Sequence, residues 1–485
     1  MKTSKEYKES LKKMRPNIYK FGKLIEDVTT HPATKRTVEG HAQIFDAAQK
    51  EEYKETLTTK SYLTKKPVIR YLSILKNADD MIANVKMKRL MFNLTGTCTG
   101  GRCAGFNALN AMWAATYDID KECKTDYHKR VRNWLKGAQE RDITLAGALT
   151  DPKGDRSKSP SQQTDPDMNL HIVEEKEDGI VVRGAKVMIC GVAAANELFI
   201  MPGTGYRDED KDYAVSFVIP RDIENLTIVE ARRPSDIREL EKGFDIPVEK
   251  GGITQAYLLF EDVFIPKERV FMCKEFTYSL KAVMNFIAPY RAAIGGCVAG
   301  QGDLMIGAAA LIARANGLSE KAFRGKITQM IINNETTFGM GIAASVLGKK
   351  HPSGVWIPDQ LLSNVNKVHV GTLPYDTKRI TQDIAGGIAE TGCLPSCVDI
   401  NNSKYGDLLK KYLSANCSGE ARAKIARLVE WLTIGAGVPG CMHGGGSPDG
   451  AKIMINAKSD VNHYIDLAKR LINLKEDIKV EPKKK

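Results

Sequence analysis

The first part of the chain carries apolar residues at helical spacing. Six of them recur every three or four positions near the N-terminus, and residues 86–92 and 107–117 are rich in Met, Leu and Ala. This spacing predicts helices, because it gathers apolar side chains on one helical face. His31–Pro32 interrupts the pattern, since the residue before a proline disfavours helix. We predict an N-terminal helical domain over residues 1–140. The six positions are Tyr7, Leu11, Met14, Ile18, Phe21 and Ile25.

The pattern changes near residue 143. A dense turn signal at residues 150–155 is followed by short runs rich in Val, Ile, Leu and Phe. Two of these runs, 170–174 and 179–182, flank Glu177–Asp178 and predict a hairpin. Strands separated by turns in this way predict a middle antiparallel β-domain over residues 141–275. Further strands are predicted at 198–201, 213–219, 226–229 and 257–264.

The last part of the chain returns to helical periodicity. Its segments predict a C-terminal four-helix bundle within residues 276–485. Pro289 should kink the first of these helices. The resulting fold class is α+β, with helices first, a β-domain second and a helix bundle third. The four helical segments are 276–315, 320–347, 359–384 and 421–436.

The composition fits a globular protein of several domains. The chain has 485 residues, of which 42% are hydrophobic and 27% charged. It holds no run of eighteen apolar residues, and its Lys-rich N-terminus lacks the apolar core of a secretory signal. We therefore expect no membrane span and a cytoplasmic location. Ten cysteines in such a chain are expected to be thiols, metal ligands or small buried side chains rather than disulfides.

The net charge of +12 indicates which class of ligand the protein attracts. Lysines and arginines alternate with acidic residues almost everywhere, and only residues 479–485 form a dense basic cluster. A diffuse positive potential attracts small polyanions such as a coenzyme A thioester. We expect a small-molecule partner and no nucleic acid.

Five segments combine glycines with polar residues, and each would be an ordinary turn if taken alone. Together and in this order they resemble the 4-hydroxybutyryl-CoA dehydratase/vinylacetyl-CoA isomerase family over nearly the whole chain. That family shares the acyl-CoA dehydrogenase fold with flavin-dependent 4-hydroxyphenylacetate 3-monooxygenases. The segments are 150–156 (TDPKGDR), 178–186 (DGIVVRGAK), 260–266 (FEDVFIP), 383–387 (DIAGG) and 442–448 (MHGGGSP).

The resemblance implies bound FAD, a homotetramer and flavin sites built at subunit contacts. Hydroxyl, backbone and guanidinium groups around Thr150 and Arg156 can donate to a flavin and its pyrophosphate. Gly386 and Gly387 let a backbone approach a dinucleotide without an intervening Cβ. The implied cofactor-binding residues are Thr150, Gly154, Asp155, Arg156, Gln163, Cys190, Gly386, Gly387, Gly445 and Ser447.

The same family holds a [4Fe–4S] cluster with three cysteines and one histidine, the first two spaced C-x3-C on one helix. Cys103 matches the second ligand, but Thr99 stands at the first position and Cys98 lies one residue earlier. One residue turns a helical side chain by about 100°, so Cys98 leaves the face of Cys103 unless the glycines at 100 and 101 unwind the helix.

Cys297 matches the third cysteine of the family, but Tyr290 stands at the histidine position. The metal candidates are therefore Cys98, Cys103 and Cys297, with Cys190 or Cys441 as a fourth ligand in principle. Two interpretations stay open. The cysteines either hold a cluster through an unusual fourth ligand or are small buried side chains.

Further family residues are replaced, among them groups that would move the substrate's protons. Removing a proton from an unactivated β-carbon needs bases of matched pKa and a Lewis acid. The dehydration of 4-hydroxybutyryl-CoA is therefore not expected of this chain. The substituted positions are Gln255 and Gly440 for glutamates, Ile294 for a tyrosine, Val298 for a lysine and Cys190 for a threonine.

Three functions remain. The first is a flavoenzyme, an oxidoreductase or lyase, acting on the CH–CH bond of an acyl-CoA, with Tyr290, Arg291, Gln255 and His443 as catalytic candidates. The second is a reduced-flavin monooxygenase of phenols, for which Arg102 and His128 lie in the right broad region. The third is a catalytically idle paralogue that keeps the fold.

Overall fold

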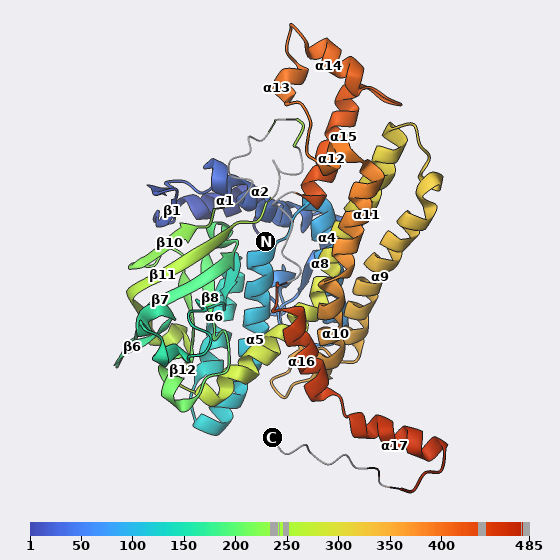
Figure 1. Ribbon diagram of the computed structural model, residues 1–485. Helices are drawn as coiled ribbons and strands as arrows, with labels where there is room; N and C mark the ends of the chain where they lie inside the picture. The colour runs from blue at the N-terminus through green and yellow to red at the C-terminus, as the bar shows by residue number, and fades with distance from the viewer. Residues whose placement is uncertain (233–240, 242, 246–251, 435–442, 477, 479–485) are drawn as a thin grey trace.

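The computed structural model describes residues 1–232, 241, 243–245, 252–434, 443–476 and 478. Helices and β-strands alternate along the chain, so the mixed helix-and-sheet class is confirmed (Figure 1). The first helices lie beside the sheets and pack with them in one hydrophobic core. They are α1 (Ser4–Lys12), α2 (Pro32–Ala47), α3 (Glu51–Leu57), α4 (Ala78–Thr95), α5 (Gly100–Cys123) and α6 (Tyr127–Arg141).

The helix predicted from residue 7 to residue 25 is wrong beyond its first turns. A capping box between Thr3 and Glu6 starts α1, which ends at Lys12. Strand β1 (Ile18–Lys20) follows and pairs with a strand of the middle region. The helical spacing misled because a three-residue strand is too short to display its own alternation.

The middle region forms two sheets. One has the order β2-β1-β10-β11-β7-β6 and the other β12-β9-β8-β5. The predicted hairpin is confirmed as the antiparallel pair β6–β7. The prediction of a purely antiparallel domain is wrong, because β1 runs parallel to β10 and β5 parallel to β8. The strands are β2 (Lys23–Leu24), β5 (Leu145–Ala148), β6 (His171–Lys176), β7 (Gly179–Cys190), β8 (Glu197–Ile200), β9 (Val215–Pro220), β10 (Leu226–Glu230), β11 (Gln255–Pro266) and β12 (Val270–Cys273).

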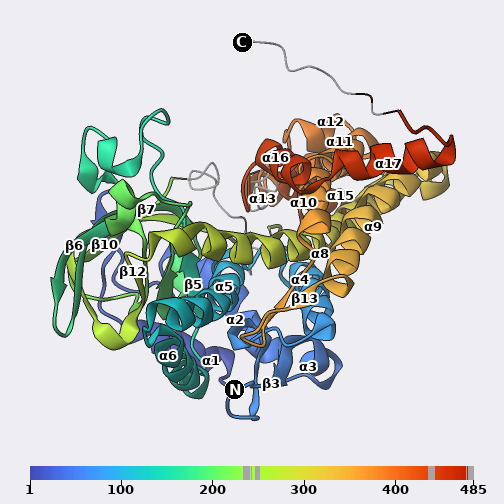
Figure 2. The same ribbon diagram turned by 90° about the horizontal axis from the view of Figure 1, so that it is seen from below.

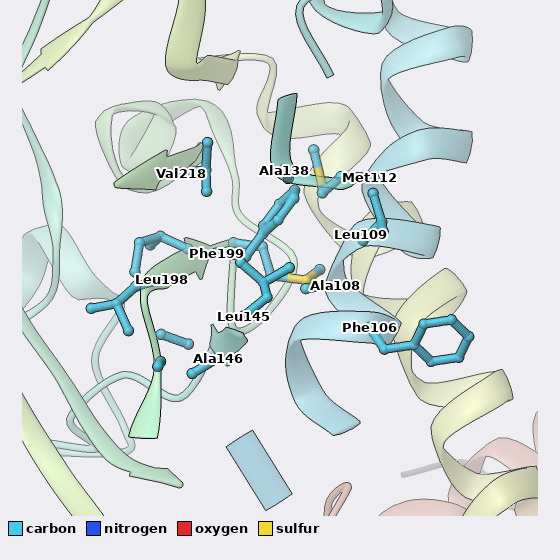
Figure 3. Packing of buried hydrophobic residues seen from close by; sticks show 14 of the residues in the cluster. Phe106, Ala108, Leu109, Met112, Ala138, Leu145, Ala146, Leu198, Phe199 and Val218 are labelled. Atoms are coloured by element: carbon cyan, nitrogen blue, oxygen red, sulfur yellow. The ribbon is translucent and has the colours of Figure 1, made fainter. Parts of the chain in front are cut away.

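Helix α5 packs directly against the four-stranded sheet. Figure 3 shows Phe199 of β8 and Leu145 of β5 facing side chains of α5 such as Leu109 and Met112. The approach is close, because a Cβ at Gly105 would lie 2.4 Å from the carbonyl oxygen of Leu145. This contact fixes the start of α5 relative to the strand ends.

The C-terminal helices lie close to the predicted helical segments, with one difference. The segment predicted as one helix over 359–384 is two, because Gly371 and Thr372 end α10 and Pro374 starts the next helix. The first helix continues through Pro289 without a break, and its kink stays a prediction. The helices are α8 (Ser279–Ala315), α9 (Arg324–Val346), α10 (Gln360–Val370), α11 (Leu373–Ala385) and α15 (Gly419–Thr433).

Glycines let α8 approach its neighbours closely. A Cβ at Gly296 would lie 2.0 Å from the carbonyl oxygen of Val85 in α4, and one at Gly295 would lie 2.2 Å from that of Thr337 in α9. Both distances are below any real Cβ contact, so only glycine fits. Figure 2 shows α8 running from the sheets to the bundle, with one half beside each.

Two helical segments stand out by their apolar or exposed residues. Among the described residues, one helical stretch (Phe276–Ala315) is long and apolar enough to cross a membrane, and 61% of its most apolar window is buried inside the protein. At the other end of the bundle, α16 (Pro448–Lys458) leads into α17 (Val461–Leu471), which extends beyond the body of the chain (Figure 1). No residue of α17 is buried, and its Leu471 is 85% exposed.

Candidate active site

The candidate site lies where the start of α5 meets the end of β7 and the first half of α8. A Cβ at Gly101 would lie 2.6 Å from the carbonyl oxygen of Cys190, so the helix touches the strand end. Because α5 begins at Gly100, Cys98 lies in the loop before the helix. The helical offset expected between Cys98 and Cys103 therefore does not apply.

Cys98, Cys103 and Cys297 gather around Tyr290 from three elements. Burial, reinforced by these thiols and by Cys190, raises the pKa of the Tyr290 hydroxyl well above its ordinary value. The neighbouring Cys297 thiol and burial raise the pKa of the Cys98 thiol. We call Cys98, Cys103, Cys297, Tyr290 and Lys88 the thiol site.

Lys88 of α4 is the member of the thiol site that the sequence interpretation missed. It is 5% exposed, and its ammonium lies 5.4 Å from the centroid of the Tyr290 ring. Its charge opposes the rise in the pKa of the Cys98 and Cys103 thiols. The available signal was its position, since Lys88 falls on the same helical stripe as buried Met81, Val85 and Met91. A lysine on a buried stripe needs a specific partner.

Arg291 holds a glycine loop against the thiol site. Its Nε donates to the carbonyl oxygen of Gly445 at 2.9 Å, and its Nη1 donates to Asn364. The buried Lys367 donates to the carbonyl oxygen of Gly444 at 2.7 Å. Gly445 has φ +72°, and a Cβ there would lie 2.7 Å from the Tyr290 ring. Arg291 therefore has a positioning contact, and Gly445 contacts the site through its backbone.

The other residues of this loop lie away from the thiol site. Ser447 caps α16 by accepting a hydrogen bond from the Gly450 amide at 3.0 Å. His443 is exposed. Among the described residues, its side chain makes no contact with Tyr290 or Arg291. Gly440, Cys441 and Met442 lie outside the described residues.

Gln255 and Cys190 form one wall beside the thiol site. They are paired across β11 and β7, and the Gln255 amide lies 3.5 Å from the Cys190 sulfur. The neighbouring Thr254 is 5% exposed, and its hydroxyl has no hydrogen-bond partner among the described residues. A buried hydroxyl is normally paired, so this wall can take a polar ligand.

The loop after β5 places its predicted cofactor residues mostly at the surface. Gln163 donates to the carbonyl oxygen of Asp155 at 2.9 Å and accepts from the Asp155 amide at 3.0 Å, which closes the loop on itself. Gly154 has φ +50° and packs on Gln163. Arg156 is exposed, whereas Thr150 at the base is half-buried, with its carbonyl bonded to Val187 of β7.

Gly386 and Gly387 lie elsewhere in the chain. The preceding residues Ile384 and Ala385 pack in an apolar cluster with residues 305–313 of α8. Tyr290 stands at least fifteen residues earlier in that helix, which corresponds to roughly 20 Å of helix length. Among the described residues, nothing lies within 4 Å of a Cβ built on either glycine. One chain therefore does not bring these glycines to the thiol site.

The two residues considered for phenol hydroxylation also lie outside the thiol site. Arg102 is buried with its guanidinium 4.3 Å from the Phe45 ring, in the core of the N-terminal helices. His128 packs edge-on to Trp113 at 4.8 Å between centroids.

The thiol site does not fit a [4Fe–4S] cluster. No three His, Cys, Asp or Glu side chains are arranged to hold a metal ion anywhere in the part of the chain that the structure describes. Of the two interpretations left open by the sequence, this finding favours cysteines that hold no cluster.

Comparison with known proteins gives strong and extended matches. The family descriptions 4-hydroxyphenylacetate 3-hydroxylase N terminal and C terminal match residues 3–272 and 280–473. The 4-hydroxybutyryl-CoA dehydratase/vinylacetyl-CoA-Δ-isomerase of Clostridium aminobutyricum is 38% identical over 490 residues, covering 98% of this chain and 99% of that protein. The 4-hydroxyphenylacetate 3-monooxygenase oxygenase component of Thermus thermophilus is 27% identical and covers 89% of this chain and 88% of its own.

The solved structures agree. An oxygen-tolerant archaeal 4-hydroxybutyryl-CoA dehydratase from N. maritimus superposes with a TM-score of 0.94 at 36% identity, over 100% of this chain and 97% of that one. A 4-hydroxyphenylacetate 3-monooxygenase oxygenase component solved with FAD and 4-hydroxyphenylacetate shares the fold, with a TM-score of 0.85 at 23% identity, over 98% of both chains. The chain therefore belongs to the 4-hydroxybutyryl-CoA dehydratase/vinylacetyl-CoA isomerase family within the wider 4-hydroxyphenylacetate 3-hydroxylase family.

Proposed function

We propose that this chain is an FAD-dependent enzyme that acts on the acyl chain of a coenzyme A thioester without an iron–sulfur cluster. The observation that carries the proposal is the 38% identity, along 98% of the chain, to a dehydratase/isomerase of an acyl-CoA. The cluster is left out because the thiol site does not fit one.

The wall formed by Thr254, Gln255 and Cys190 would hold the flavin ring. Its support is the buried Thr254 hydroxyl, which has no partner among the described residues, and the Gln255 amide, whose hydrogen bond goes to a sulfur, a weak acceptor. Thr150, at the base of its loop, would reach the cofactor from the adjoining strand. Bound FAD would supply hydride or single-electron transfer.

Tyr290 would hold the proton that the reaction uses. Its raised pKa keeps the hydroxyl neutral near pH 7, so Tyr290 donates a proton or a hydrogen bond and does not act as a base. Gln255 cannot take up a proton and would only orient a ligand. This set suits transfer of hydride to or from an acyl chain better than removal of an unactivated β-proton.

We further propose that the active enzyme is a cytoplasmic homotetramer in which a neighbouring chain completes the flavin site. Support comes from Gly386 and Gly387, which lie far from Tyr290 within one chain. Exposed apolar side chains on α9 and α17, such as Ile332 at 53% and Leu471 at 85%, would be covered by neighbouring chains.

The test is spectroscopic. The purified protein, saturated with FAD, is reduced without oxygen and mixed with crotonyl-CoA. We expect the absorbance of oxidised flavin to return as the acyl-CoA is reduced, and Tyr290→Phe to slow this return. Tyr278→Phe is the matched control, because its hydroxyl contacts Glu122 away from the thiol site.

The outcomes separate the three functions. Flavin reoxidation by crotonyl-CoA or another short acyl-CoA supports the proposal. Hydroxylation of 4-hydroxyphenylacetate by reduced flavin and oxygen would favour the monooxygenase. A protein that binds FAD but responds to neither substrate would be the idle paralogue, and the proposal would fail.

A further inference from the structure

A cleft lies beside the short hairpin that follows α9. The hairpin consists of β13 (Lys349–Lys350) and β14 (Trp356–Ile357), and the cleft is bounded by this hairpin, the start of α10 and the end of α16. The two helices pack side by side (Figure 1). The volume of the cleft is about 600 Å³, which is within the range of sites that bind small organic ligands.

Three lysines line this cleft. Lys349 and Lys350 belong to the hairpin, and Lys458 ends α16. All three are exposed, and within the described part of the chain none of them forms an ion pair. The one carboxylate of the lining, that of Asp359, is engaged at the start of α10, where it accepts a hydrogen bond from the Leu362 amide at 2.8 Å. The cleft therefore presents a net positive charge, which attracts anions.

The cleft also has an apolar wall. Leu347 lies just after α9, Ile357 in β14 and Leu361 in the first turn of α10. The Leu347 side chain is 61% exposed, so the chain itself leaves much of this wall uncovered. A flat organic ring can cover such a wall, while lysines bind phosphate groups through charge-assisted hydrogen bonds. The lining therefore suits a ligand with a ring at one end and phosphates at the other.

We propose that this cleft binds a phosphorylated nucleotide, with the base against the apolar wall and the phosphates at the lysines. Its size supports a nucleotide over inorganic phosphate, which would fill a small part of the volume and would leave the apolar wall bare. Two sources share this chemistry. One is a free nucleotide, and the other is the nucleotide end of a coenzyme A thioester.

The cleft is separate from the thiol site but is linked to it by hydrogen bonds. The carbonyl oxygen of Gln360, in the lining, accepts from the Asn364 amide at 2.7 Å. Asn364 accepts in turn from Arg291, which donates to the carbonyl oxygen of Gly445 at 2.9 Å. A ligand at the start of α10 thus contacts the helix that anchors the glycine loop. Binding at the cleft is measured without turnover, so the inference goes beyond the proposed acyl-CoA reaction and does not depend on it.

The experiment measures the binding of adenosine 3′,5′-bisphosphate by isothermal titration calorimetry. It uses the full-length protein with its bound cofactor, after free nucleotide has been removed by gel filtration. Lys349→Glu combined with Lys350→Glu should weaken binding by about 100-fold, because two attractive charges become repulsive. Lys458→Glu, on a different element, should weaken it by about tenfold and so checks that the loss does not come from a disturbed hairpin.

The matched control changes the net charge equally at a distance from the cleft. Lys12→Glu combined with Lys13→Glu alters two adjacent exposed lysines at the end of α1, which do not line the cleft. Because salt screens distant charges, binding should stay within about twofold. Equal losses in the two double variants would overturn the inference, since they would mean that only the overall charge attracts the bisphosphate.

Two further results would also overturn the inference. They are a failure of the bisphosphate to bind and an equally tight binding of inorganic phosphate. Competition identifies the source of a nucleotide that does bind. Displacement of the bisphosphate by crotonyl-CoA, lost in the Lys349→Glu and Lys350→Glu double variant, would assign the cleft to the thioester. Binding of the bisphosphate that crotonyl-CoA does not displace would assign it to a free nucleotide.

Discussion

The two halves of α8 show how one helix can serve two purposes. Its first half places Tyr290, Arg291 and Cys297 beside strand ends and loops, within contact of Lys88 and the glycine loop at 444–446. Its second half, from Met305 to Ala315, packs in an apolar cluster with α11 and α15. The comparison teaches that the chemical groups of one chain gather at the first half, while the second half packs beside α11, which is followed by Gly386 and Gly387.

We expect the largest effect from removing the hydroxyl oxygen of Tyr290 in the first half of α8. Tyr290→Phe keeps the ring between Gly445 and Lys88 but removes the proton donor, so we expect turnover of an acyl-CoA to fall by about 100-fold or more. Steady-state kinetics with FAD-saturated protein measure this. An unchanged rate with Tyr290→Phe would show that the chemistry does not use the thiol site.

The packing of the two halves can be compared with two alanine substitutions in the same helix. Gly296→Ala places a Cβ 2.0 Å from a carbonyl oxygen of α4, so we expect the free energy of unfolding to fall by about 2–3 kcal/mol. Gly307→Ala meets nothing within 4 Å in the described part of the chain and should stabilise the helix by up to about 1 kcal/mol. Chemical denaturation measures both. Equal effects of the two substitutions would contradict the close packing of α8 on α4.

The sequence was sufficient for the long helices and for most strands. The runs that became α8, α9, β7 and β11 each have a sustained period, and the predicted hairpin paired as expected. Short elements were missed where the period had no room to develop. β1 has three residues and was hidden in a helical pattern, and the break at Gly371 was read as continuous helix.

The site could be predicted from sequence only where residues stand next to a family motif. Cys98, Cys103, Cys297 and Tyr290 were found in this way, and the three thiols lie near enough to raise the pKa of Tyr290. Lys88 has no motif around it, and only the packing of α4 on α8 brings it to Tyr290. The roles of Gly154 and Gln163 could not be separated either, because a turn closed on itself and a turn around a ligand use the same residues.

Lys88 allows a test of how a nearby positive charge affects the thiols beside the first half of α8. Its positive charge favours the Cys98 thiolate, so Lys88→Met should raise the pKa of Cys98 further. The rate of alkylation at a fixed pH below that pKa should then fall. Iodoacetamide labelling followed over a pH series measures the shift. Lys86→Met, at an exposed lysine of the same helix, should leave the profile unchanged, and a similar shift in both variants would refute a specific role for Lys88.

The smallest expected effect belongs to the glycines beyond the second half of α8. Nothing in the described residues of one chain lies within 4 Å of a Cβ at Gly387, so Gly387→Ala should leave the free energy of unfolding of the chain within about 0.5 kcal/mol. If a neighbouring chain brings a flavin against this backbone, the added methyl group should weaken FAD binding by about threefold, which is below 1 kcal/mol. Fluorescence titration of the apoprotein with FAD measures the dissociation constant. Gly339→Ala, in α9 and equally open, is the matched control. An FAD affinity of Gly387→Ala equal to that of Gly339→Ala would mean that the second half of α8 serves packing alone and that the flavin is held within one chain.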